Sequence, residues 1–148
     1  MATLTKSVLI DAPIEKVFAY LENPMNMLDV WPSMVDIRNI QSTDGGLKTY
    51  EWTYKMAGMK LDGSSVDVES VPYERMVTVS KGGIESTITW LFSAEDGKTR
   101  LTSITEYSVP MPVLGKLAES IILKTNDREA ETLLVNIKTM LEQPEPVQ

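Results

Sequence analysis

The sequence predicts an α+β domain in which an antiparallel sheet of seven strands is covered by a long C-terminal helix. The stretch TYEWTYKM (residues 49–56) alternates bulky apolar and polar side chains, as a strand with one buried and one solvated face does. Turn signals separate further stretches of β character, and short strands joined by tight turns form an antiparallel meander. These signals are Asp44-Gly45-Gly46, Ala57-Gly58, Pro72-Tyr73-Glu74, Lys81-Gly82-Gly83 and Asp96-Gly97.

The strands and the first helices follow in a simple order. The first strand is expected at residues 3–10, and the six strands of the meander at 34–43, 47–57, 60–71, 74–81, 84–94 and 98–109. A helical insertion separates the first strand from the meander. Asp11 or Ala12 is expected at its cap and Pro13 at the first helical position, where no N–H donor is needed. Asn23-Pro24 ends this helix, and a second short helix is expected at residues 24–28.

The covering helix is expected at residues 113–142, and its apolar residues fall on two stripes. One contains Leu114, Leu117, Ala118, Ile121 and Ile122, and the other Ala130, Leu133, Leu134, Ile137, Met140 and Leu141. The stripes lie roughly 120° apart around the helix, so a straight helix cannot press both onto one flat surface. It either kinks within residues 124–129 or buries its halves against different parts of a curved sheet. A twisted sheet with one apolar face needs such a cover.

Length and charge limit the classes of function. A chain of 148 residues is most simply one domain, here residues 1–142 followed by a disordered tail at 143–148. The formal net charge of −7 argues against nucleic acid and against an anionic membrane surface as partners. No stretch approaches the ~20 apolar residues of a membrane span, and the N-terminus lacks the apolar core of a signal peptide. We therefore expect a cytoplasmic monomer.

The chain contains neither cysteine nor histidine. These absences exclude disulfides, thiolate nucleophiles, histidine metal ligands and the serine–histidine pair, so acid/base chemistry falls to Asp, Glu, Tyr or Lys. No phosphate-binding loop is present, because the glycine pairs at 45–46 and 82–83 fit turns. The carboxylates Asp62, Asp67 and Glu69 lack the spacing of a calcium loop and are interpreted as a solvated strand face. No metal or other cofactor is expected.

The inward faces of three strands combine rings, aliphatic side chains and hydroxyl groups. Apolar walls with a few polar groups are typical of a ligand pocket, whereas aromatic residues are also common core fillers; periodicity alone leaves both interpretations open. The residues expected to line a pocket are Tyr50, Trp52, Tyr54, Ile88, Trp90, Phe92, Tyr107, Leu117 and Ile121, with Ser86 and Ser103 as polar groups among them.

Thr125 and Arg128 continue the first helical stripe beyond Ile121. A buried charge needs a partner, so Arg128 is expected at the rim of the cavity or in solvent. If Arg128 faces inward, an acidic or carbonyl-bearing ligand is its natural complement.

Three segments carry a family resemblance: IDAPIEKVFAYLENPMNMLDVWP (10–32), YSVPMPVLGKLAESI (107–121) and LLVNIKTMLE (133–142). Their most specific parts are Ile10, Ala12 and Pro13 at the entry to the first helix, Val17-Phe18, Trp31-Pro32, and Tyr107 before the prolines. Together they resemble the START / birch-pollen-allergen superfamily (SRPBCC), in particular its polyketide cyclase/dehydrase-like branch. The resemblance implies a helix-grip fold, in which the sheet curves around the C-terminal helix and encloses a hydrophobic cavity. It favours cavity lining over core filling for the aromatic rings.

Three functions follow as hypotheses. The first is binding, as a carrier or by sequestration, of a small hydrophobic ligand such as a lipid, a polyketide or an isoprenoid-type molecule. The second is a cyclase or dehydratase in which Tyr50, Tyr54, Tyr107 or an inward carboxylate polarises a carbonyl and moves a proton; it rests on the resemblance, because the chain carries no catalytic motif. The third is a protein-interaction module, which an exposed apolar patch would support.

Overall fold

The computed structural model describes residues 2–56, 58–82, 85–108 and 115–143, and for residues 2, 44, 56 and 115–123 it describes the backbone only. The elements follow in the order β1 (Ala2–Ile10), α1 (Ile14–Glu22), η1 (Pro24–Asn26), α2 (Met27–Val30), β2 (Met34–Ser42), η2 (Asp44–Gly46), β3 (Lys48–Met56), β4 (Met59–Val71), β5 (Arg75–Gly82), β6 (Glu85–Glu95), β7 (Lys98–Ser108) and α3 (Gly115–Glu142). The predicted strands are all present, with ends that differ by one residue.

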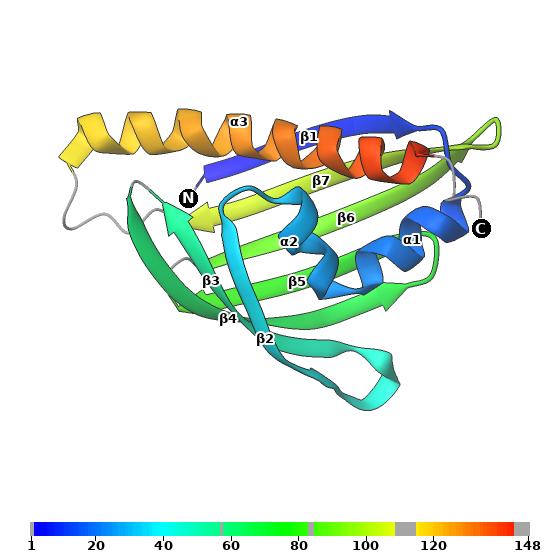
Figure 1. Cartoon of the computed structure of the whole chain (residues 1–148), viewed down its shortest axis with the longest axis horizontal. Helices are drawn as coiled ribbons and strands as arrows, with labels where there is room; N and C mark the ends of the chain where they lie inside the picture. Colours follow the sequence, from blue (N-terminus) through cyan, green and yellow to red (C-terminus); the bar gives the residue numbers. More distant parts are fainter. Residues whose placement is uncertain (1, 57, 83–84, 109–114, 144–148) are drawn as a thin grey trace.

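The seven strands form one antiparallel sheet in the order β1-β7-β6-β5-β4-β3-β2. The chain starts at one edge, crosses through the helices α1 and α2 to the opposite edge, and returns strand by strand. The sheet is curved, α3 lies alongside β1, and α1 packs against β6 and β7 (Figure 1). The helix-grip fold is therefore confirmed.

The segment between β1 and β2 differs in detail from the prediction. Pro13 is itself the N-cap of α1, because its ψ of 151° is extended, and the helix begins at Ile14. The expectation that Pro13 would be the first helical residue, capped by Asp11 or Ala12, is wrong by one place. The single short helix expected at 24–28 is instead the 3₁₀ turn η1 followed by α2, and the Asn23 side chain caps η1 by accepting a bond from the Met25 backbone N–H at 3.1 Å.

The helix α3 runs unbroken from Gly115 to Glu142, so the kink allowed within residues 124–129 does not occur. Four residues of its second stripe are buried: Leu133, Leu134, Ile137 and Leu141. Met140, predicted on the same stripe, is exposed. The side chains of the first stripe and residues 144–148 of the expected tail lie outside the described residues. No helix in the described ranges is long and apolar enough to cross a membrane.

The C-terminal half of α3 is tied to β1 at several points. Lys6 pairs with Asp127 at 2.9 Å and Glu131 at 3.1 Å, while Lys138 Nζ donates to the backbone oxygen of Leu9 at 2.9 Å. Solvated ion pairs of this kind contribute little to stability. The apolar face of α3 therefore supplies most of the stabilisation, and the polar contacts fix its position along the strand.

Several of the most deeply buried side chains lie around this half of α3. The most deeply buried side chains are Ile10, Val17, Val30, Thr99, Leu101 and Ile137. The hydroxyl group of Thr99 is satisfied, because it donates to the backbone oxygen of Ala12 at 2.8 Å. This end of the concave face is filled by side chains, and the space described next lies further along the sheet.

Candidate ligand-binding cavity

A cavity of about 150 Å³ lies between the concave face of the sheet and the helices. Side chains from all seven strands, from α1, η1 and α2 and from the middle of α3 line it. Its lining includes Glu22, Gly46 and Ser70, which are exposed to solvent. The cavity therefore reaches the surface near the end of α1.

The sequence-predicted residues divide into three groups. Those that line the cavity are Tyr50, Trp52, Tyr54, Ser86, Ile88, Trp90, Ser103 and Tyr107. Phe92 faces the same side of β6 but does not line the space; its ring packs edge-on against Phe18 of α1, with centroids 5.1 Å apart. Thr125 and Arg128 are exposed and do not line the cavity either. The side chains of Leu117 and Ile121 lie outside the described residues.

Trp52 occupies the centre of the aromatic wall on β3 and depends on a glycine opposite. Gly63 of β4 is its direct neighbour in the sheet register. A Cβ atom at position 63 would lie 2.2 Å from Cζ2 of Trp52 and 2.6 Å from the backbone oxygen of Lys81. Glycine is required there because the indole ring lies across the strand where any side chain would stand.

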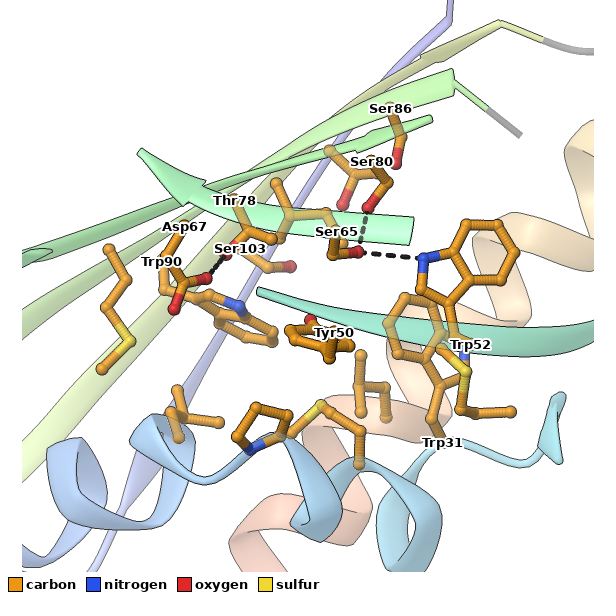
Figure 2. A pocket seen from close by; sticks show the side chains of 18 of the residues that line it. Trp31, Tyr50, Trp52, Ser65, Asp67, Thr78, Ser80, Ser86, Trp90 and Ser103 are labelled. Carbon is orange, nitrogen blue, oxygen red and sulfur yellow. Dashed lines mark hydrogen bonds between the residues drawn. The ribbon is translucent and has the colours of Figure 1, made fainter. Parts of the chain in front are cut away.

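The indole N–H of Trp52 has a fixed hydrogen-bond partner. It donates to Oγ of Ser65 at 2.9 Å, and Ser65 and Ser80 share a bond of 2.6 Å between their hydroxyl groups. Both serines are buried (Figure 2). The chain of bonds crosses β3, β4 and β5, so it fixes the orientation of the ring. The sequence analysis missed both serines, although the alternation of β4 places Ser65 on the inward face.

Two carboxylates that were interpreted as solvated in fact border the cavity. Asp67 is half-buried, and its Oδ1 accepts from the hydroxyl group of Thr78 at 2.7 Å (Figure 2); Glu69 also lines the space. Asp62 is exposed and lies 3.8 Å from Arg38. Asp62 and Asp67 are five positions apart on one strand, and successive residues of a strand point to opposite faces. The earlier interpretation therefore holds for Asp62 but is wrong for Asp67 and Glu69.

The far end of the aromatic wall is built around Tyr54. The rings of Trp31 and Tyr54 meet edge-on with centroids 5.7 Å apart. Glu129 of α3 borders the same end, and its Oε1 accepts from the backbone N–H of Ser33 at 2.7 Å. Two polar atoms of lining residues, Nε1 of Trp31 and the hydroxyl oxygen of Tyr107, are buried and make no hydrogen bond of good geometry with the described residues, although Trp31 lies close enough to the Tyr54 phenol to affect its pKa.

The phenols of Tyr50 and Tyr54 are protonated at neutral pH. Burial raises the pKa of Tyr54 to about 12, and the negative charge of Glu129 acts in the same direction, while the nearby side chains of Ser33 and Trp31 act against it. Burial also raises the pKa of Tyr50 to about 12, against the opposing effect of its hydrogen bond with Ser65. Both side chains are therefore suited to donate a hydrogen bond, and neither is suited to accept a proton.

The charged residues around the cavity are mostly acidic. The described lining contains four carboxylates, Glu22, Asp67, Glu69 and Glu129, and one ammonium group, Lys48. Lys48 is already engaged, since its Nζ donates to the backbone oxygen of Glu22 at 2.8 Å. Within the described residues no group of three or more acidic side chains could hold a metal ion. The cavity can thus accommodate uncharged groups and hydrogen-bond acceptors, and it disfavours anions.

Comparisons with known proteins agree on the fold. The chain is similar in structure to TTHA0849 from Thermus thermophilus (TM-score 0.83, 18% identity, covering 95% of this chain and 97% of that one). It is also similar to the Zhui aromatase/cyclase from Streptomyces sp. R1128 (TM-score 0.82, 15% identity, 95% and 93%) and to a START superfamily protein from Mycobacterium smegmatis (TM-score 0.77, 15% identity, 95% and 97%). At these identities the likeness concerns the fold alone.

Sequence comparisons are more specific. No curated protein matches the chain significantly by sequence. The model of one family, described as polyketide cyclase / dehydrase and lipid transport, matches residues 1–142. This match covers every helix and strand, and the chain therefore belongs to the polyketide cyclase / dehydrase and lipid transport family.

Proposed function

We propose that the protein binds a small, largely apolar ligand in the cavity, as a carrier or by sequestration. The observation that carries this proposal is the aromatic wall of Tyr50, Trp52, Tyr54 and Trp90, which borders an open space instead of closing over it. Rings in a filled core pack against other side chains. Here they border a void of about 150 Å³, and apolar walls with a few polar groups are what a ligand site requires.

The volume of the cavity defines the size of ligand. Sites for drug-sized molecules usually measure about 300–1,000 Å³, and a closed cavity of about 150 Å³ accepts a molecule of the size of benzene. The cavity in its present form matches a single substituted ring. A longer lipid or polyketide chain would extend through the opening beside Glu22 and Ser70, which border the cavity and are exposed.

A cavity-filling substitution tests the proposal. Ser103 is buried on the cavity wall, at the centre of β7. Ser103→Leu should occupy the space and reduce the affinity for isopropylbenzene at least tenfold, measured by ligand-observed NMR titration. Thr102→Leu on the opposite face of the same strand is the matched control and should leave the affinity unchanged. Equal, non-saturable responses in the wild type and both variants would contradict binding in the cavity.

An enzymatic function of the cyclase or dehydratase type is the second candidate, and the inward carboxylate of Asp67 favours it. A carboxylate on the wall of an apolar cavity is placed to take a proton from a carbon next to a carbonyl group, while the protonated phenol of Tyr50 donates a hydrogen bond to the oxygen that becomes negative. Asp67→Asn should then abolish turnover of a panel of aromatic polyketones while isopropylbenzene binding persists. Absence of turnover in the wild-type protein would leave binding as the function.

A further inference from the structure

The carboxylate of Asp67 lines the cavity without a cationic partner. Its Oδ1 accepts from the hydroxyl group of Thr78 at 2.7 Å, and its Oδ2 accepts from the backbone N–H of Lys48 at 3.3 Å. Both donors are neutral, and Asp67 forms no ion pair within the described part of the chain. A carboxylate on the wall of a largely apolar space calls for a partner of opposite charge.

Asp67 lies close to the opening of the cavity. Lys48, whose backbone N–H binds Asp67, donates from its Nζ to the backbone oxygen of Glu22, and Glu22 is exposed where the cavity reaches the surface. Glu69 also borders this part and is paired with Arg75. The opening is therefore acidic. A cation beside it keeps part of its hydration and avoids the full cost of transfer into an apolar interior.

Aromatic rings lie next to this carboxylate. Tyr50 is opposite Ser65 in the register, and Asp67 is the next inward residue of β4. Such diagonal neighbours are about 7–8 Å apart, and the pKa of Tyr50, which burial raises, is raised further by the charge of Asp67. The side chains of Tyr50, Trp90 and Asp67 point into the same space (Figure 2). An aromatic face attracts a cation, so the rings and the carboxylate favour the same kind of group.

A second acceptor in the cavity is unused. Ser103 is 4% exposed and lines the space, and its hydroxyl group makes no hydrogen bond of good geometry with the described residues. This hydroxyl group and the carboxylate of Asp67 are directed into the same space (Figure 2). Buried polar groups without a partner are rare in native structures, and a hydroxyl oxygen can accept from an N–H group. The wall thus offers acceptors to a ligand that brings the donors.

We propose that the cavity binds a protonated amine, with the ammonium group at Asp67 beside the opening and an aromatic ring against Tyr50 and Trp90. An ammonium group brings a positive charge and three donors, whereas a hydroxyl group brings one donor and no charge. A ligand carboxylate would add a negative charge next to Glu22 and Glu69. This inference rests on the proposed function and specifies the chemical class of its ligand.

Three ligands of the same shape separate charge from ring binding. Isopropylbenzene, 1-phenylethanol and 1-phenylethylamine differ only in one group, which is methyl, hydroxyl or, at pH 7, ammonium. In NMR titrations at low ionic strength, the amine should bind the wild-type protein about tenfold more tightly than the alcohol. Added salt should reduce this preference. The carboxyl ¹³C resonance of Asp67 should shift with the amine and not with isopropylbenzene, which requires no variant.

Two variants with the same change of charge locate the site. Asp67→Asn keeps the shape of the side chain and should reduce the ratio of amine to isopropylbenzene affinity at least about threefold. Asp62 lies on the same strand, is exposed and does not line the cavity. Asp62→Asn is therefore the matched control and should leave the ratio unchanged.

The outcomes distinguish this inference from the proposed function. An alcohol that binds as tightly as the amine, an unshifted Asp67 resonance, or equal effects of Asp62→Asn and Asp67→Asn would overturn the amine site. Saturable binding of isopropylbenzene would in each case still support the cavity. If none of the three ligands binds, both proposals fail.

Discussion

Trp52 and Trp31 line the same cavity, but they are held in different ways. Trp52 is 4% exposed; its N–H donates to Ser65, and its ring lies over Gly63. Trp31 is half-buried, its N–H makes no hydrogen bond of good geometry with the described residues although it lies near the Tyr54 phenol, and its ring meets the edge of Tyr54. One indole is fixed by a good hydrogen bond to the sheet, whereas the other is held by its contact with Tyr54 alone among the ring and hydrogen-bond contacts of good geometry in the described residues. A shared location therefore does not imply a shared role.

The difference follows from the elements that carry the two residues. Trp52 lies in β3, which is paired with β2 on one side and β4 on the other. Trp31 is the C-cap residue of α2, a helix of four residues at the entrance to β2. A residue on a strand that is hydrogen-bonded to a neighbour on each side is held firmly in place. A residue at the end of a short helix is less constrained.

The largest expected effect comes from Gly63→Ala, because the new methyl group would occupy the space now filled by the ring of Trp52. The new Cβ would lie 2.2 Å from the indole ring and 2.6 Å from the backbone oxygen of Lys81, so ring and strand cannot both stay in place. Overpacking of this kind costs about 1–3 kcal/mol, and the loss of the bond to Ser65 adds to it. We expect urea denaturation to show a loss of roughly 3 kcal/mol. Ser64→Ala, at the exposed next position, should change stability by less than about 0.5 kcal/mol.

Replacing each indole by phenylalanine should separate the two roles. Trp52→Phe removes buried ring volume and one satisfied hydrogen bond, so we expect a loss of about 2 kcal/mol in the free energy of unfolding. Trp31→Phe removes a donor that makes no hydrogen bond of good geometry with the described residues, so its cost should stay below about 1 kcal/mol. Thermal and urea denaturation of the two variants provide the measurement. Equal losses would mean that both indoles are structural.

Ser65→Ala should reproduce part of the Trp52 effect. The buried indole N–H would lose its acceptor, and an unsatisfied buried donor costs about 1–3 kcal/mol. We expect about 1.5 kcal/mol, together with a shift in the fluorescence emission of Trp52. In the background of Trp52→Phe, the same substitution should cost clearly less, because the donor is already absent. Additive losses would show that the bond contributes nothing to stability.

The smallest expected effect is a loss of stability at alkaline pH caused by Tyr54, the tyrosine whose ring contacts Trp31. The folded pKa of Tyr54 is raised from 10.0 to about 12, so above pH 10 the unfolded chain loses this proton while the folded protein keeps it. The folded state then holds more protons, and its stability falls as the pH rises from about 10 to 12. At pH 10.5 the contribution of Tyr54 to this loss is about 0.8 kcal/mol. Tyr54→Phe should flatten the profile by that amount; an unchanged slope would contradict the burial of the phenol.

The sequence predicted the strands and most of the aromatic wall because both follow from alternation within one strand. It missed Ser65 and Ser80 and misplaced Asp67, although alternation within β4 separates Ser65 and Asp67 from Asp62. What alternation does not contain is which strands lie side by side: Ser65 lies opposite Tyr50 on β3 and opposite Ser80 on β5. Alternation also predicted the face of Phe92 but not its position along the strand. Two residues advance a strand by about 6.6 Å, which is enough to move a ring from the cavity into the core.

Glu129 and Trp31 were missed for a related reason. Their side chains meet the cavity from the helices, and the angle at which α3 crosses the sheet decides which of its residues border the space. The apolar stripes predicted which face of α3 is buried at Leu133 and Leu134. They contain no information about which turn of the helix lies above Tyr54. The wall made by the sheet is therefore predictable from a single chain, and the wall made by the helices requires the structure.

The packing of Trp52 across Gly63 also has an evolutionary consequence. A large side chain at position 52 is compatible only with glycine at 63, because the ring occupies the place of the missing Cβ. A mutation that shrinks residue 52 removes this restriction and at the same time opens a gap that a side chain at 63 fills. The two positions should therefore change together over the history of the family, and relatives with a small residue at the position of Trp52 should have lost the glycine.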